Sequence, residues 1–213
     1  MKPVRRVLFA GYYRLGRSSF AIVCDARPVA WAMGTLSEMT LADVVEVLDA
    51  LEQRGVQYWL AGGWGIDALL GRPMRRHVDL DLLLPCHGAV SADPAVDALR
   101  PLGFRPVMSR PASLLMPGRV IVADGTGRAI DLLPLDVRRR PFSDHAREGT
   151  GPTVRAVLDG RTVDCLCAPL QLELHEGTPL RRSVRVDIAA LWGYAAAMTS
   201  THAPSEQSVR RAP

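Results

Sequence analysis

The chain lacks any long apolar run, contains a single lysine and has only four cysteines in 213 residues. No stretch approaches the ~20 consecutive apolar residues that cross a bilayer, so we predict no membrane partner. All but one of the 26 basic residues are arginine, and clusters such as 138–140 are typical of solvated loops. The few cysteines, without a clear secretory signal, favour reduced thiols in a cytoplasmic protein over a disulfide framework.

Two other interpretations of these scarce residues stay open. Arg5 and Arg6 loosely resemble a twin-arginine export signal, although Arg14 interrupts the apolar stretch that follows. Cys165 and Cys167 could hold zinc, although paired zinc-binding cysteines normally have two residues between them. We expect these two cysteines to alternate along a strand instead.

The excess of positive charge lies at the N-terminal end. Residues 1–38 hold six basic and two acidic residues, which leaves 20 of the 26 basic and 20 of the 22 acidic residues in 39–213. A neutral body carries no electrostatic footprint for a polyanion, so we predict no nucleic-acid partner. We treat 1–38 as an N-terminal extension whose place in the protein the sequence leaves open.

From residue 39 onward, apolar periodicity predicts alternating helices and strands. The predicted core, 39–137, has a helix capped by Thr40 and stopped at Gly55, a strand at 56–62, a helix at 64–70, a strand at 78–84, a helix at 94–101, a strand at 103–108 and a hairpin at 119–135. The predicted C-terminal part, 138–200, has a polar loop, a hairpin at 154–168 and helices at 169–177 and 184–199. Residues 201–213 have the composition of a disordered tail.

Two aspartates share one face of the predicted strand VDLDLLL, residues 78–84. Strand side chains alternate, so Asp79 and Asp81 point the same way, with Cα atoms about 6.6 Å apart. Like charges so close in an apolar segment are costly to bury without a cation, and a hard ion such as Mg²⁺ suits them. Asp131, flanked by apolar residues in the predicted hairpin, supplies a third carboxylate if its strand pairs with 78–84.

A pair of glycines, Gly62 and Gly63, ends one predicted strand and opens a short helix. Without side chains they let a phosphate approach the backbone, and a helix N-terminus offers free N–H groups and partial positive charge. Arg75, Arg76 and His77 precede the aspartate strand and are either solvated loop charge or phosphate contacts. We therefore assign these five residues to nucleotide binding.

The stretch GGWGIDALLGRPMRRHVDLD, residues 62–81, resembles the signature of the nucleotidyltransferase superfamily. That signature has two small residues, a short helix and then Asp-x-Asp within an apolar strand. The chain is most similar to the aminoglycoside 2''-nucleotidyltransferase and lincosamide nucleotidyltransferase branch. The similarity continues through DGTGRAIDLLPL at 124–135 and through the segment 160–191, so that it covers roughly residues 40–195.

This resemblance implies an α/β nucleotidyltransferase fold, with a short mixed β-sheet, flanking helices and a small, mainly helical C-terminal part. It implies that Asp79 and Asp81 hold Mg²⁺ and a nucleoside triphosphate, and that Asp131 is a third metal ligand or the base. Gly62 and Gly63 would contact phosphates. The implied reaction transfers a nucleoside monophosphate, usually AMP from ATP, to a hydroxyl of a small molecule such as an aminoglycoside- or lincosamide-like antibiotic.

Two positions depart from the pattern of that branch. Leu133 replaces the histidine that follows the third aspartate, and Thr178 replaces a tyrosine after His-x-Gly. These departures leave open a non-catalytic nucleotide-binding module of the same fold. A protein-nucleotidylating enzyme of the antitoxin type is the other alternative. The oligomeric state does not follow from the sequence.

Three further residues are assigned to structure rather than chemistry. Asp67 lies inside the short helix, where it can hold Arg72 or His77. Trp64 is expected to pack in the core, and His175 to support the C-terminal part.

Overall fold

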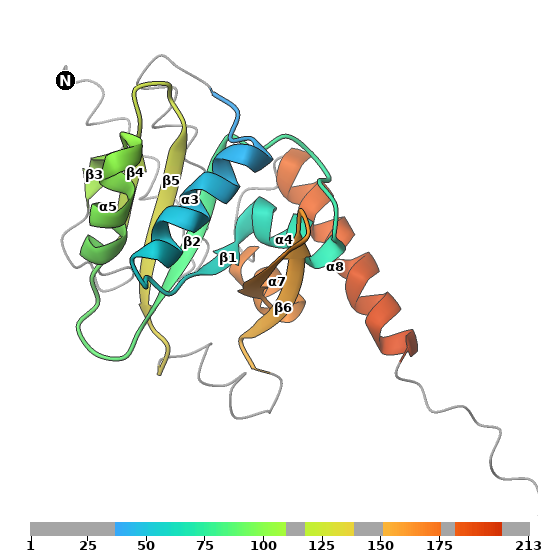
Figure 1. Ribbon diagram of the computed structural model, residues 1–213. Coiled ribbons are helices and arrows are strands. Elements are labelled where there is room, and N and C mark those ends of the chain that lie inside the picture. Colours follow the sequence, from blue (N-terminus) through green and yellow to red (C-terminus); the bar gives the residue numbers. More distant parts are fainter. Residues whose placement is uncertain (1–36, 110–117, 139–150, 176–181, 202–213) are drawn as a thin grey trace, which may run out of the picture.

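A seven-stranded mixed β-sheet runs through the protein, in the strand order β3-β4-β5-β2-β1-β7-β6 (Figure 1). The computed structural model describes residues 37–109, 118–138, 151–175 and 182–201. Most of the predicted N-terminal extension, the predicted tail after 201 and Thr178 lie outside the described residues. The strands are β1 (Trp59–Ala61), β2 (Asp79–Cys86), β3 (Arg105–Ser109), β4 (Val120–Ala123), β5 (Ala129–Asp136), β6 (Thr153–Leu158) and β7 (Arg161–Leu166).

The helices agree with the predicted pattern, and each predicted element is present with ends that differ by a few residues. They are α3 (Leu41–Gln53), α4 (Gly62–Leu70), α5 (Asp93–Leu99), the 3-10 turn η1 (Arg100–Leu102), α7 (Ala168–His175) and α8 (Arg182–Thr201). The predicted mixed sheet with flanking helices is therefore confirmed.

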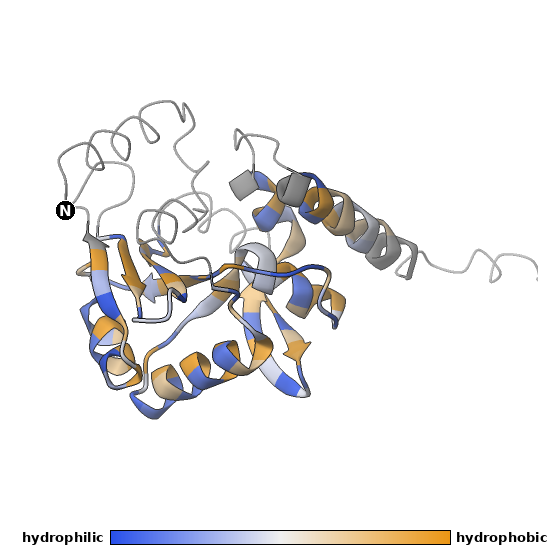
Figure 2. Cartoon of the chain, turned by 90° about the horizontal axis from the view of Figure 1, so that it is seen from above, coloured by the Kyte–Doolittle hydropathy of each residue, from blue (hydrophilic) through white to orange (hydrophobic). Residues whose placement is uncertain are grey.

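Helix α3 begins with the predicted cap. Thr40 Oγ1 accepts from the Asp43 N–H at 3.3 Å, and Asp43 Oδ2 accepts from the Thr40 N–H at 2.8 Å, which satisfies two N–H groups at the start of the helix. The helix alternates hydrophilic and hydrophobic residues (Figure 2). Its buried residues are Val44, Val47, Leu48 and Leu51, and they join the core under α3 and α5 on one face of the sheet (Figure 1).

The central strands β2 and β5 pair in parallel, with Asp79 opposite Ala129 and Asp81 opposite Asp131. Alternate residues of β2 point into the main core, which holds Leu80, Leu82 and Leu84. The intervening residues point to the opposite face. One face of β2 and β5 thus packs under helices α3 and α5, and the other carries the aspartates.

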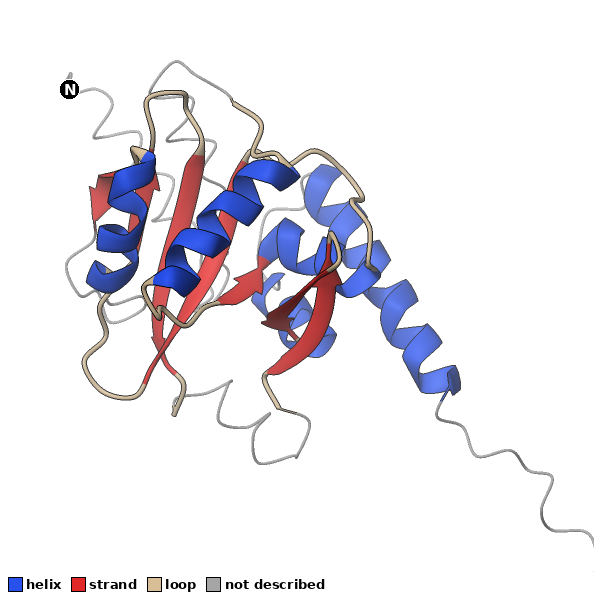
Figure 3. Cartoon of the chain, viewed as in Figure 1, coloured by secondary structure: helices blue, strands red, loops and turns tan. Residues whose placement is uncertain are grey.

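Helices α4, α7 and α8 pack against one another beside the end of the sheet that holds β1, β7 and β6 (Figure 3).

The β6–β7 hairpin turns at Asp159 and Gly160, both with positive φ, as predicted for the Asp-Gly pair. Strand β7 joins the sheet by parallel pairing of Cys165 with Leu60. One sheet therefore includes strands from both sides of the predicted division at 137/138, which itself stays a prediction. Every helix in the described part of the chain is too short or too polar to cross a membrane.

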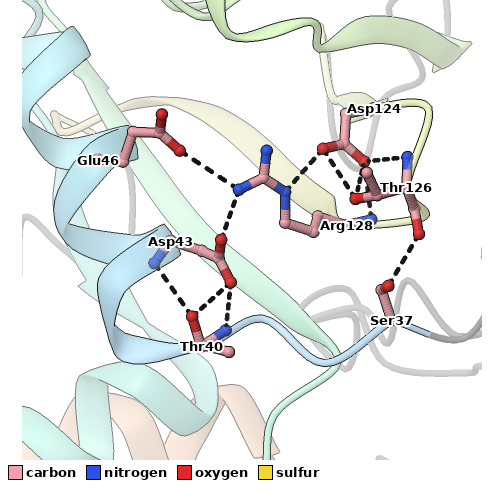
Figure 4. Close-up of polar contacts among 7 residues, drawn as sticks. All are labelled: Ser37, Thr40, Asp43, Glu46, Asp124, Thr126 and Arg128. Carbon is pink, nitrogen blue, oxygen red and sulfur yellow. Dashed lines mark hydrogen bonds and ion pairs between the residues drawn. The ribbon is translucent and has the colours of Figure 1, made fainter.

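A polar cluster fixes the start of α3 to the turn between β4 and β5 (Figure 4). Arg128 donates through NH1 to Asp43 Oδ1 at 2.5 Å and through Nε to Asp124 Oδ2 at 2.7 Å. Asp124 also accepts from the Thr126 N–H at 2.9 Å, which shapes the turn. The cluster anchors the segment that leads directly into β5 and Asp131.

Candidate active site

Three aspartates lie together on one face of the sheet. Asp79 and Asp81 are one residue apart on β2, and Asp131 lies opposite Asp81 on β5. Because the two strands pair in parallel and in register, the Asp81 and Asp131 side chains point to the same face. The prediction that the strand of Asp131 pairs with 78–84 is confirmed.

Asp81 has the properties of a cation ligand. It is buried, and its Oδ1 has no hydrogen-bond partner among the described residues. Burial raises the pKa of Asp81 well above its usual range, Asp79 and Asp131 raise it further, and Arg119 and Arg75 oppose the rise. A buried carboxylate oxygen without a partner is costly, and a cation beside it would remove that cost. Asp79 and Asp81 therefore fit a hard divalent cation such as Mg²⁺.

Asp131 is engaged by an arginine that the sequence analysis missed. Arg119, just before β4, donates to Asp131 Oδ1 at 2.8 Å through Nε and to Oδ2 at 2.5 Å through NH2. Arg119 and Asp131 are both buried, with side chains 2% and 0% exposed. Burial raises the pKa of Asp131, and the charge and hydrogen bonds of Arg119 oppose that rise.

The described residues include no group of three or more His, Cys, Asp or Glu side chains arranged to hold a metal ion. At Asp131, both carboxylate oxygens already accept from Arg119. Its roles as third metal ligand or base, and the catalytic roles of all three aspartates, stay predictions. Cys165 and Cys167 are buried free thiols, Cys165 within β7 and Cys167 just after it.

The two glycines lie against the site residues. A Cβ atom on Gly62, which has φ 56°, would lie 2.0 Å from Asp81 Oδ2. A Cβ atom on Gly63 would lie 2.3 Å from His77 Nδ1 and 2.8 Å from Arg75 NH2. Both positions therefore need glycine, because any side chain would displace a neighbour from its place beside α4.

These glycines also form the first turn of α4. The N-cap residue, Ala61, makes no side-chain hydrogen bond to that turn. The first N–H groups of a helix have no intrahelical acceptor, so this end of α4 offers donors and positive potential to an anion. Contact of Gly62 and Gly63 with phosphates stays a prediction.

The three loop residues assigned to the nucleotide differ in their surroundings. Arg75 is partly buried and forms a bidentate ion pair with Asp187 on α8. Arg76 is exposed, and its guanidinium lies 3.6 Å from Glu38. His77 is buried, with Nε2 2.6 Å from Asp67 Oδ2. Arg75 and Arg76 thus have donors that a ligand can reach, whereas His77 lies beneath the glycine turn.

The buried pair of His77 and Asp67 holds the loop between α4 and β2 in place, which confirms the predicted pairing of Asp67. Asp67 Oδ1 accepts from the Met74 N–H at 3.1 Å, which fixes the loop backbone. The Trp64 and His77 rings lie 4.7 Å apart between centroids, and Trp64 is buried as expected. The His175 side chain lies outside the described part of the structure.

The sequence model of the aminoglycoside-2''-adenylyltransferase family matches residues 43–191 of the chain. The chain belongs to this family. It is therefore a nucleotidyltransferase, as the resemblance of its motifs predicts. The matched segment extends from α3 to α8 and includes each of the three aspartates, the glycine pair and Asp187.

The names of the known relatives refer to two classes of antibiotic, lincosamides and aminoglycosides. The chain is 25% identical to a lincosamide resistance protein of Staphylococcus haemolyticus over 162 residues, which cover 73% of this chain and 96% of that protein. It is 48% identical to a 2''-aminoglycoside nucleotidyltransferase of Klebsiella pneumoniae over only 40 residues, or 19% of this chain and 23% of that protein.

Two solved structures share the fold. A lincomycin-bound lincosamide antibiotic adenylyltransferase aligns with a TM-score of 0.58 at 21% identity, over 74% of this chain and 99% of the other. The enzyme ANT(2'')-Ia in complex with adenylyl-2''-tobramycin aligns with a TM-score of 0.53 at 21% identity, over 76% and 98%. At these identities the comparison establishes the nucleotidyltransferase fold alone.

This family member departs from the expected pattern at Leu133, on the same face as the aspartates. Leu133 lies opposite Leu83 in the β2–β5 ladder and is 4% exposed. It packs in a small apolar cluster with Ala61, Leu83, Leu166, Cys167 and Leu170. An apolar contact between the sheet and α7 thus occupies the place where the branch has an imidazole.

Proposed function

We propose that this nucleotidyltransferase transfers AMP from ATP to a hydroxyl of a small molecule in a Mg²⁺-dependent reaction. The proposed acceptor class is an aminoglycoside- or lincosamide-like antibiotic, in line with the family and with the names of the relatives. The observation that supports the proposal best is the Asp79–Asp81 pair beside the start of α4, where one buried Asp81 oxygen has no partner among the described residues.

The arrangement offers one place for each part of a nucleoside triphosphate. Asp79 and Asp81 would hold Mg²⁺, which when bound neutralises phosphate charge and aligns the reacting oxygens. The first turn of α4, at Gly62 and Gly63, offers backbone N–H donors to the phosphates. Arg75, beside Gly63, adds a cationic donor on the same side.

The proposed step is an in-line displacement at the α-phosphorus. The acceptor hydroxyl oxygen forms a bond to that phosphorus, the bond to the oxygen that bridges to the β-phosphate breaks, and pyrophosphate leaves. The hydroxyl proton passes to a base or to solvent. Arg119 uses one lone pair on each Asp131 oxygen, so Asp131 keeps acceptor capacity, yet its complete burial favours a supporting role beside Asp81.

The test is a direct assay of the reaction with a matched variant. Purified protein, ATP and Mg²⁺ are incubated with a panel of aminoglycosides and lincosamides, and pyrophosphate and product mass are measured. We expect a gain of one AMP on at least one acceptor. Asp79→Asn should lower the rate by about a thousandfold, because the metal contributes several kcal/mol to the transition state.

The control is Asp164→Asn, at an exposed aspartate of β7, which should leave the rate unchanged. Near-normal turnover by Asp79→Asn would refute the metal assignment. A mass gain on a protein rather than on any small molecule would replace the proposed acceptor class by protein nucleotidylation.

A further inference from the structure

Helix α8 reaches the candidate site through Asp187, which the sequence analysis did not assign to it. Asp187 Oδ1 accepts from Arg75 Nε at 2.9 Å, and Oδ2 accepts from Arg75 NH2 at 2.7 Å. The two residues are 112 positions apart in the chain, and the Asp187 side chain is only 5% exposed. A bidentate pair of this kind fixes both the position and the plane of the guanidinium group.

The Arg75 guanidinium group, held by Asp187, lies beside the first turn of α4. Arg75 NH2 is 2.8 Å from the point that a Cβ atom of Gly63 would occupy. Burial alone would lower the pKa of Arg75, but the hydrogen bonds and charge of Asp187 raise it, and the charges of Asp79 and Asp67 add to the rise. Arg75 therefore stays charged between the first turn of α4 and the acidic strand.

Arg75 has donors left for a ligand. A guanidinium group carries five N–H donors, of which two bind Asp187 and one binds the backbone oxygen of Arg76 at 3.1 Å. The side chain is 23% exposed, so a ligand can approach it from solvent. The group thus combines a fixed orientation, a retained charge and donors that no described residue uses, beside the first turn of α4.

Asp187 is the carboxylate that holds the Arg75 guanidinium group, although the charge of Asp79 also attracts it. Both carboxylates attract the guanidinium group, as the effect of each on the Arg75 pKa shows. The bidentate pair with Asp187 thus keeps the arginine beside the start of α4, where an anion can bind it.

We propose that Asp187 is a positioning residue of the nucleotide site: it holds Arg75 beside the start of α4 so that Arg75 binds the triphosphate. This inference rests on the proposed nucleotidyl transfer. It makes α8 a part of the active site and gives a role to the aspartate in the VDIAAL segment near the end of the family match. Asp187 itself touches neither the substrate nor the reacting atoms.

The test measures MgATP affinity by calorimetric titration, without any acceptor, together with steady-state kinetics. Asp187→Asn keeps the size of the side chain but removes its charge, and should weaken MgATP binding about 10- to 100-fold, the range expected for a lost charge-assisted contact. The KM for MgATP should rise likewise, while kcat and the KM for the acceptor change much less. Asp187→Glu, which restores the charge, should recover part of the affinity.

A double-mutant cycle tests whether Asp187 acts through Arg75. Arg75→Met should weaken MgATP binding, and adding Asp187→Asn should weaken it no further. The matched control is Asp124→Asn, which removes a similarly buried aspartate from its ion pair with Arg128 in the turn between β4 and β5. This control should lower the melting temperature without changing MgATP affinity.

The outcomes separate this inference from the proposed function. Wild-type protein that binds MgATP but modifies no acceptor refutes the proposed transfer, and the variant affinities then decide the role of Asp187 alone. Unchanged MgATP affinity in Asp187→Asn, or full additivity with Arg75→Met, would overturn the inference. Wild-type protein that binds no nucleoside triphosphate would overturn both proposals.

Discussion

Arg119 donates to both carboxylate oxygens of Asp131, and the pair is buried beside the acidic strand of the candidate site. Asp131 in turn lies opposite Asp81 in the β2–β5 ladder. The positive charge of Arg119 therefore offsets part of the repulsion among the three aspartates, since it opposes the rise in the pKa of both Asp81 and Asp131. The arrangement balances charge beside the strand, while Asp81 Oδ1 has no hydrogen-bond partner among the described residues.

Removing Arg119 should destabilise the protein strongly as long as Asp131 remains. Arg119→Met should lower the free energy of unfolding by about 3–5 kcal/mol, because it leaves a buried carboxylate without its partner. The double variant Arg119→Met/Asp131→Leu should recover most of that loss, since two apolar residues can replace a buried ion pair at little cost. Urea denaturation followed by circular dichroism measures both effects.

The control for this prediction is Arg100→Met, which removes an exposed arginine from its pair with Asp97. Exposed pairs contribute little, so the change should stay below about 0.5 kcal/mol. A double variant that is less stable than Arg119→Met alone would contradict the explanation, because it would mean that Asp131 has other partners that stabilise it.

Two glycines with similar backbone conformations should respond differently to the same substitution. Gly62 and Gly55 have φ of 56° and 66°, so alanine at either position is strained by about 1 kcal/mol. At Gly62 the new Cβ atom would also lie 2.0 Å from Asp81 Oδ2, whereas at Gly55 no atom lies within 4 Å. Gly62→Ala should therefore cost roughly 1–3 kcal/mol more than Gly55→Ala and also abolish nucleotidyl transfer.

Thermal melts and the transfer assay, run on both variants, check this prediction. Equal melting temperatures would show that Asp81 moves aside without cost. Normal transfer by Gly62→Ala would show that the close approach of Gly62 to Asp81 is not required for activity.

The sequence sufficed for the features that depend on nearby residues. Alternation in 78–84 and the turn at Asp124 predict the strand, the hairpin and a shared face for the aspartates, and the structure has all three. Such features follow from local periodicity and turn chemistry. The cap at Thr40 is predictable for the same reason.

The features that the sequence analysis did not predict depend on contacts between segments far apart in the chain. Arg119 could have been found by continuing the hairpin register, because Ile121 lies opposite Asp131 and alternation then places 119 on the same face. No local signal marks the pairing of Arg75 with Asp187, which depends on how α8 packs beside α4. The long-range pairing of β7 with β1 is likewise set by tertiary packing rather than by spacing.

The three described cysteines should differ sharply in reactivity. Burial raises the pKa of Cys165 to about 12, with Asp164 and Cys167 adding to the rise, and burial also raises the pKa of Cys167. At pH 8 a thiol with such a pKa is ionised in only about one molecule in 10,000, and the thiolate is the reactive form. Cys86 is partly exposed.

The fourth cysteine, Cys24, lies outside the described residues and is replaced by serine for this test. In the Cys24→Ser variant, a thiol reagent at pH 8 should label one site rapidly and two sites only after unfolding. Adding Cys86→Ser should remove the rapid phase. Rapid labelling of all three thiols in native protein would contradict the burial of Cys165 and Cys167.

The Arg128 cluster predicts a pH dependence of stability. Burial alone would raise the pKa of Asp124, but hydrogen bonds from Arg128 and Thr126 lower it below its ordinary value. A group with a lowered pKa stabilises the fold fully above its unfolded-state pKa of about 3.8, and loses that contribution as the pH falls through the lowered value.

Asp124→Asn should thus lower the free energy of unfolding by about 1–3 kcal/mol at pH 7, and the difference from wild type should shrink below pH 4. Urea denaturation at pH 7, 5 and 3 measures it, with the exposed Asp97→Asn as a control that changes little at each pH. A constant difference between Asp124→Asn and wild type from pH 7 to pH 3 would mean that the charge of Asp124 does not stabilise the turn.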